Sequence, residues 1–209
     1  MNKIIIAKIF FLFISFPIFS QQQIDIPVEL HKELSSTKSI DEYLGSVYVF
    51  KEFRPGILKY EDKKVSLKFN INTFSNSISY IDQFGKINDL NYNPKIIISI
   101  GNQNFIYLKV NNREIVATTL AETGSNTIYK SYLAKLIPPR PSSNGYDLPK
   151  PGKVEIKKNY IFFIEGNYTI VDSDKKAITS AFPDYRDLIK SYKLRFKKEV
   201  DFINFFKLL

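Results

Sequence analysis

The chain has 209 residues and a formal net charge of +9, with no cysteine, no tryptophan and a single histidine. The missing cysteines exclude disulfides, thiolate metal sites and cysteine nucleophiles, and they leave no cysteine to carry a lipid anchor. Once a leader is removed, the remaining length suits one good-sized domain.

Residues 1–20 have the pattern of a cleavable export signal. Lys3 and Lys8 give a cationic start, 9–19 is apolar, and Ser20 is a small residue ahead of three glutamines. The apolar run is about half as long as a bilayer crossing requires. We therefore predict a signal peptide, export to the periplasm or the extracellular space, and no transmembrane segment after cleavage. An uncleaved anchor and a buried first helix are the alternatives.

The positive net charge limits the classes of partner that we expect. Lys3 and Lys8 of the leader account for two of the nine net charges. An exported protein is removed from nucleic acids, which leaves anionic lipid headgroups, polysaccharides or plain solubility as uses for the charge. The lysines are spread along the chain, a pattern that favours a solvated basic surface and no nucleic-acid partner.

We predict a flexible lead-in over 21–44 and a single β-rich domain over 45–209. The clearest strand is 65–71, where apolar residues alternate with Ser66, Lys68 and Asn70. The residues expected on its buried face are Val65, Leu67, Phe69 and Ile71. Further strands are predicted over 47–53, 57–60, 77–82, 96–100, 105–110, 114–120, 129–136, 159–165, 168–172 and 176–182.

Short polar links favour antiparallel pairing of these strands. Pro55 and Gly56 suit the centre of a type II turn, and 101–104, 111–112 and 165–167 suit hairpin turns. A parallel sheet would need crossovers of about a dozen residues or more. The predicted fold is α+β and mainly β: an antiparallel meander, either a half barrel or a sandwich, with two C-terminal helices.

Two segments depart from the strand pattern. The first, 138–152, contains five prolines and two glycines, which predicts a long exposed loop inside the domain, lid-like or linking. The second is the tail 183–209, where apolar residues recur at helical spacing. Its stripes are Tyr185, Leu188, Ile189 and Tyr192, then Val200, Phe202, Ile203, Phe206 and Leu209. We expect both helices to dock on the sheet, with a membrane-surface helix or a partner helix as alternatives.

Short motifs resemble a family of Bacteroidetes-type exported proteins. In that family a G-x-x-Y-L and E-F-x-P-G opening leads into an L-R-Y-N-I strand, and an amphipathic pair ends the chain. The matching segments here are 45–48 (GSVY), 52–56 (EFRPG), 67–71 (LKFNI), 185–189 (YRDLI) and 196–203 (FKKEVDFI). The resemblance covers nearly all of the mature chain, and it implies no settled activity, cofactor or catalytic residue.

The chain departs from this family after the LKFNI strand. Relatives tend to place an acidic residue there, whereas this chain has Ser75, Asn76, Ser77 and Ser79. The departure removes support for a carboxylate role at that hairpin.

Few residues suit catalysis or metal binding. His31 lies in the lead-in, where we expect a surface residue and not a general base. A zinc site would need an all-carboxylate shell, and a Ser-His-Asp arrangement would need His31. Asp172 and Asp174 could open a calcium loop, but the two lysines that follow favour a hairpin turn.

Other acids leave an enzymatic alternative open. Glu114, Glu122 and Glu155 have no partner nearby in sequence, although strands could bring two of them together at glycosidase spacing. Gly101 and Gly124 stand alone, with no phosphate loop around them. We assign no catalytic, cofactor-binding or metal residue and no cofactor.

Aromatic side chains make up 15% of the residues and lie mostly on predicted strands. We expect most of them to pack in the core and on the sheet, with an apolar or sugar-stacking surface as the alternative.

The function expected is a non-catalytic binding or envelope accessory domain, whose partner is an envelope protein, an apolar ligand or a saccharide. The alternatives are a hydrolase with a carboxylate pair and a lipid or lipoprotein carrier with a hollow half barrel. In such a carrier the predicted inner face at 65–71 would line the hollow, whereas we expect the C-terminal helices to fill that core.

Overall fold

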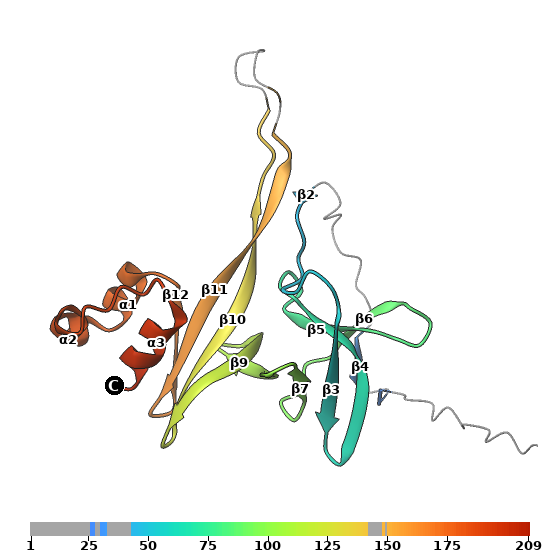
Figure 1. The fold of residues 1–209 in the computed structure, drawn as a ribbon, viewed down its shortest axis with the longest axis horizontal. Coiled ribbons are helices and arrows are strands. Elements are labelled where there is room, and N and C mark those ends of the chain that lie inside the picture. The colour runs from blue at the N-terminus through green and yellow to red at the C-terminus, as the bar shows by residue number, and fades with distance from the viewer. Residues whose placement is uncertain (1–25, 28–29, 33–42, 142–147, 149) are drawn as a thin grey trace, which may run out of the picture.

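The structure is a computed structural model that describes residues 26–27, 30–32, 43–141, 148 and 150–209 (Figure 1). The predicted signal peptide lies outside the described residues, as does most of the predicted lead-in. Within the described part of the chain, no helix has the length and apolarity needed to cross a membrane.

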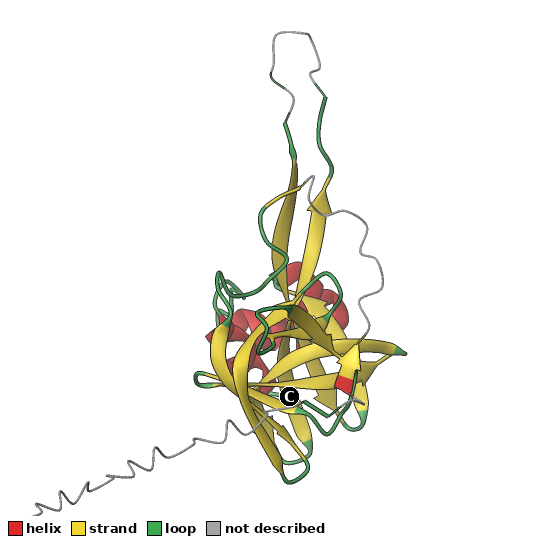
Figure 2. Cartoon of the chain, turned by 90° about the vertical axis from the view of Figure 1, so that its right-hand side faces the viewer, coloured by secondary structure: helices red, strands yellow, loops and turns green. Residues whose placement is uncertain are grey.

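Twelve strands form one curled sheet, and short helices follow at the C-terminal end (Figures 1 and 2). The spatial order is β1-β6-β5-β4-β3-β7-β8-β9-β10-β11-β12, with β2 paired to β11. The strands are β1 (His31–Lys32), β2 (Tyr43–Leu44), β3 (Arg54–Tyr60), β4 (Lys63–Asn72), β5 (Ser77–Ile81), β6 (Ile87–Leu90), β7 (Ile97–Ile100), β8 (Gln103–Val110), β9 (Arg113–Thr123), β10 (Asn126–Ile137), β11 (Gly152–Ile164) and β12 (Asn167–Asp172). The helices are α1 (Lys175–Ala181), the 3-10 helix η2 (Pro183–Tyr185), α2 (Arg186–Ser191) and α3 (Glu199–Phe206).

Strands that are adjacent in sequence are mostly adjacent in the sheet. β3 to β6 form one antiparallel run, β7 to β12 form a second, and the runs join where β7 pairs with β3. Asn111 and Asn112, between β8 and β9, have φ values of 51° and 61°, as a two-residue hairpin turn requires. Among the described strands only β2 and β11 pair in parallel. The predicted antiparallel half barrel with C-terminal helices is confirmed.

The run from β3 to β8 curls around a core of its own. Phe69 and Ile71 of β4 lie at its centre, Val65 is also buried, and Leu67 packs at the edge, as the alternation predicts. Ile26 and Leu30, from the predicted lead-in, belong to the same core. Each fully buried side chain of this size contributes about 1.5–3 kcal/mol of burial free energy. Strand side chains and these two residues, and not the C-terminal helices, fill the inner face of β4.

Side-chain hydrogen bonds also connect strands of the half barrel that are not neighbours in the sheet. The Tyr107 hydroxyl donates to the Leu90 carbonyl at 2.9 Å and accepts from the Ile78 amide at 3.1 Å. The Asn76 side chain donates to the Glu114 carbonyl at 2.7 Å and accepts from the Val116 amide at 3.2 Å. These bonds connect β8 and β9 to β5 and β6 and so hold the half barrel in its curved form.

A second core lies between β10 to β12 and the helices. Phe202, Phe205 and Phe206 of α3 are buried against the strands, and Tyr160 of β11 stacks on Phe202 with ring centroids 3.6 Å apart. The tail therefore packs on the sheet, as predicted.

The segment 176–182 was predicted as a strand, and that prediction is wrong because α1 covers most of it. The Asp174 side chain accepts a hydrogen bond from the Ala177 amide at 2.8 Å and so caps the first turn of the helix. The link 172–174 is accordingly a strand-to-helix connection and not a hairpin turn. The two α-helices predicted for the tail 183–209 are α2 and α3, and α1 is a further helix that precedes the tail.

Two predictions near the start of the domain are also wrong. Residues 47–53 form no regular strand but only an isolated bridge, with Tyr48 opposite Asn72. The pairing stops at Phe50, whose amide and carbonyl are bonded by the Asn70 side chain at 3.0 Å and 2.8 Å. Pro55 and Gly56 lie inside β3 and not in a turn. A Cβ atom at Gly56 would come within 2.7 Å of the Ser99 carbonyl oxygen of β7, so this glycine allows the two strands to pair.

Of the predicted proline-rich loop 138–152, the structure describes only 138–141, 148 and 150–152, and the described ends continue the hairpin arm formed by β10 and β11 (Figure 1). The remaining residues of the predicted loop lie outside the described residues. β10 and β11 continue past the rest of the sheet, with Ile137 opposite Lys153. Arg140 and Lys150 then exchange two backbone hydrogen bonds of 2.9 Å. Apart from β10, only β2, at Tyr43–Leu44, pairs with this outer part of β11 among the described strands.

Candidate functional site

A hollow with a volume of about 790 Å³ lies on the outer face of the half barrel. Its floor comes from strands that are neighbours in the sheet. Ile57 of β3 pairs with Ser66 on one side and Ser99 on the other, so these three side chains share the outer face. Pro55 pairs with Lys68, and Lys68 with Ile81, which extends the floor across β5.

The turn between β5 and β6 forms one wall of this hollow. Asp82 organises the turn, since its side chain accepts hydrogen bonds from the Phe84 and Lys86 amides and from the Asn88 side chain, each at 2.9 Å. Burial alone would raise the pKa of Asp82, but these hydrogen bonds outweigh it and lower the pKa. Asp82 is thus an ionised structural residue and not a proton donor at neutral pH.

An exposed aromatic residue, Phe84, belongs to the same turn. Phe84 is 85% exposed, and its neighbours Gln83 and Gly85 both line the hollow. Phe84 was not among the residues singled out from the sequence. A bulky aromatic between two turn-forming residues is the signal that could have identified it, because turns usually carry small or polar side chains.

The lining mixes apolar surface with a few neutral polar groups. Ile57 is 41% exposed, and Pro55, Leu67 and Ile81 add further apolar surface. Ser66, Ser99 and Gln83 supply hydroxyl and amide groups, and Lys68 is the one cation of the lining. Such a lining can bind a ligand with an apolar face and a polar edge, but it has no acid and base arranged for catalysis.

A buried carboxylate lies inside the half barrel, close to the hairpin where none was expected. Asp89 of β6 accepts hydrogen bonds from Ser77 at 2.6 Å, from Ser75 at 3.1 Å and from Ser79. These three serines stand where the family that the chain resembles tends to have an acid. Here they surround an acid that comes from the next strand, β6. Asp89 is the single buried acid of the described chain, and sequence reasoning missed it because β6 is short and half polar.

Neighbouring tyrosines respond to this buried charge. Burial raises the pKa of Tyr80 to about 12, and the negative charges of Asp82 and Asp89 act in the same direction. Burial also raises the pKa of Tyr48, with Asp89 as the second cause. Every hydroxyl around Asp89 donates to its carboxylate or is otherwise satisfied, which gives this cluster a structural role.

The structure does not bring the candidate acids together. Glu114 and Glu122 are exposed at separate positions of β9, and Glu155 lies on the hairpin arm, where its carboxylate is 3.2 Å from the Lys153 ammonium. His31 belongs to β1, with its backbone opposite Leu90. In the described chain, no three histidine, aspartate or glutamate side chains group in a way that would hold a metal ion.

Most strand aromatics have the core role that was expected. Phe69, Tyr80, Phe105 and Phe162 are fully buried, as members of the two main cores. Comparison of the chain with protein-family models, with curated proteins and with solved structures found no match.

Proposed function

We propose that this protein is an exported, non-catalytic binding domain that holds a saccharide in the hollow over β3, β4, β5 and β7. The observation that carries the proposal is an open apolar floor with hydroxyl and amide groups beside it, next to a turn that carries the exposed aromatic residue Phe84. A sugar ring offers an apolar C–H face to such a floor and directs its hydroxyls outward. Aromatic side chains commonly stack on ligands at sites of this kind.

The alternatives have less support from the described residues. A hydrolase with a carboxylate pair needs two acids that face each other, whereas the one buried acid, Asp89, is bonded to serine hydroxyls. A lipid carrier needs a hollow interior, whereas Phe69 and Ile71 on the inner face of β4 are fully packed. Export remains an inference from the sequence of residues 1–20.

The proposal is tested by NMR titration of the purified protein with a panel of neutral trisaccharides. We expect amide shifts at Ile57, Ser66, Ser99 and Gln83. Ile57→Asp and Phe84→Ala should each weaken binding by about tenfold, since a buried contact is worth about 1–3 kcal/mol in a site of this size. Phe74→Ala is the matched control, because Phe74 is an exposed aromatic in the turn between β4 and β5, and no residue of that turn lines the hollow.

Native mass spectrometry of the same preparation provides an independent measurement. A retained ligand with the mass of a glycan would support the proposal, and a retained lipid would favour the carrier. Saccharide shifts confined to other surfaces, or none with any member of the panel, would contradict the proposal.

A further inference from the structure

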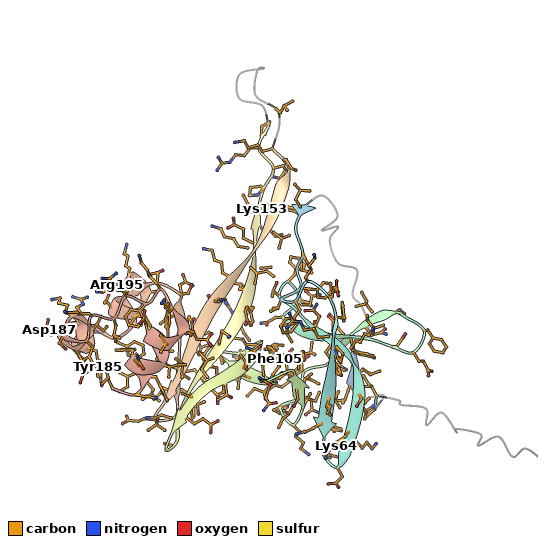
Figure 3. The ribbon with its side chains drawn as sticks, viewed as in Figure 1. Lys64, Phe105, Lys153, Tyr185, Asp187 and Arg195 are labelled. Atoms are coloured by element: carbon orange, nitrogen blue, oxygen red, sulfur yellow. The ribbon has the colours of Figure 1, made fainter. Side chains whose placement is uncertain are left out.

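We infer that a second pocket, at the helical end of the molecule, is a binding site for an oxyanion of the phosphate type. The pocket has a volume of about 450 Å³ and lies between β11, the start of α1 and the start of α3. It is separate from the saccharide hollow: Figure 3 places Arg195 at the helical end and Lys64, in the β3–β4 hairpin, at the opposite end. The inference does not depend on the proposed function.

Four cations line this pocket. They are Lys158 of β11, Lys175 at the start of α1, and Arg195 and Lys197 of the segment before α3. None of the four has an ion-pair partner among the described residues. Four positive charges from three separate segments, gathered around one concave space, repel one another unless an anion lies between them.

The two acids of the pocket lining are already engaged elsewhere. Glu199 accepts a hydrogen bond from the buried Lys130 ammonium at 2.7 Å, and Asp174 caps α1 through the Ala177 amide at 2.8 Å. A third acid, Asp201, accepts from the Lys197 backbone amide at 3.2 Å. These three carboxylates form no ion pair with the four lining cations, and once Lys130 is counted the five cations of this region exceed its three acids by two charges.

The pocket also has a rigid base. Tyr160 and Phe202 line it and stack on each other with their planes at 11°, and both are almost fully buried. The first turn of α3 begins at the pocket and has no side-chain cap, so the positive end of its dipole adds to the four side chains. A doubly charged phosphate, with oxygens on several sides, matches cations that approach from three segments.

The test is isothermal titration of the full protein with inorganic phosphate at low ionic strength. The triple variant Lys175→Gln, Arg195→Gln, Lys197→Gln should weaken binding at least tenfold. The control triple Lys176→Gln, Lys193→Gln, Lys207→Gln removes the same charge from exposed residues outside the pocket, and it should change affinity less than twofold. An equal loss in both triples would mean diffuse surface attraction and would overturn the site.

Two further measurements complete the test. In the unaltered protein, phosphate should shift the amide resonances of Ser173, Lys175 and Lys197, and shifts elsewhere alone would contradict the inference. Sedimentation with phosphatidylcholine vesicles containing phosphatidic acid then separates the sources. Binding to both probes identifies a phosphate headgroup, binding to inorganic phosphate alone identifies a free anion, and binding to neither probe overturns the proposal.

Discussion

The ammonium group of Lys130 lies 2.7 Å from the Oε2 atom of Glu199, and this ion pair joins strand β10 to the first turn of helix α3. The Lys130 side chain is only 6% exposed, whereas that of Glu199 is 39% exposed. Burial by itself would lower the pKa of Lys130, but the Glu199 carboxylate and the Tyr132 hydroxyl more than compensate, so the pKa is raised. The ion pair therefore holds the start of α3 against β10, beside the basic pocket.

Loss of the Glu199 carboxylate should destabilise the fold, because the buried Lys130 charge would lose its partner. We expect Glu199→Gln to lower the free energy of unfolding by about 1–3 kcal/mol, below the value for a fully buried pair because Glu199 is partly solvated. Adding Lys130→Met should recover part of the loss, since no buried charge then remains. Urea unfolding of the two single variants and the double variant measures the coupling. Strictly additive losses would show that the contact does not stabilise the fold.

Alkaline pH should destabilise the protein above about pH 10. Burial raises the pKa of Tyr80 and of Tyr160 to about 12, and it also raises the pKa of Tyr107. The folded chain keeps these protons where the unfolded chain, with tyrosine near 10, has lost them. Their stabilising effect is complete below pH 10 and is lost as the pH rises towards 12. The raised pKa of Lys130 acts in the same direction.

Each retained proton should add about 1.4 kcal/mol per pH unit to this decline. Chemical unfolding at pH 8, 10, 11 and 12 gives the slope directly. Tyr160→Phe preserves the stack on Phe202 and should reduce the slope by about one proton. A constant stability across this range would contradict the expected linkage.

Gly56→Ala should destabilise the half barrel by about 1–3 kcal/mol, the usual cost of overpacking. The new methyl group would meet the Ser99 carbonyl oxygen at 2.7 Å and the Phe69 ring at 3.0 Å, and backbone moves less readily than a side-chain end. Gly124→Asn is a suitable control, because its site is open and asparagine accepts its φ of 60°. If both variants have the melting temperature of the parent, then the close approach of β3 and β7 at Gly56 does not contribute to stability.

The tip of the hairpin arm should be replaceable. Arg140 and Lys150 exchange both backbone hydrogen bonds, as the closing pair of a two-residue hairpin does. Substitution of residues 141–149 by Asn-Gly should therefore change the free energy of unfolding by less than about 0.5 kcal/mol, since surface changes away from the core have small effects. Thermal unfolding and an NMR fingerprint check this. A larger loss would mean that the removed residues pack against the domain.

Sequence patterns predicted the sheet where alternation was strong and long. The strand 65–71 was clear because its apolar residues recur at every second position. The pair Asn111-Asn112 indicated a hairpin turn, because asparagine accepts the positive φ that such a turn requires. β6 was missed because its Ile-Asn-Asp-Leu sequence is too short to show a period. The polar Asp89 at its centre is buried only because three serines from the preceding strand and turn solvate it.

Other errors came from residues whose role depends on distant partners. Pro55-Gly56 has the composition of a turn, but the approach of β7, forty residues later in the chain, makes Gly56 a strand residue. The segment 176–182 has mixed apolar residues that suit either structure, and the decisive signal was the capping Asp174 just before it. Neither the outer hollow nor the basic pocket could be predicted, since each combines residues from three or more separate segments.

Strand β10 contributes to both main cores: Ile128 packs with the helices, and Tyr132, four residues later, packs with the half barrel. Neither half can come apart without displacing a strand that the other half also needs. Heating should accordingly give one cooperative transition with a calorimetric enthalpy equal to the van't Hoff enthalpy. Occupation of either pocket would then protect the whole molecule, including the end that the ligand does not touch.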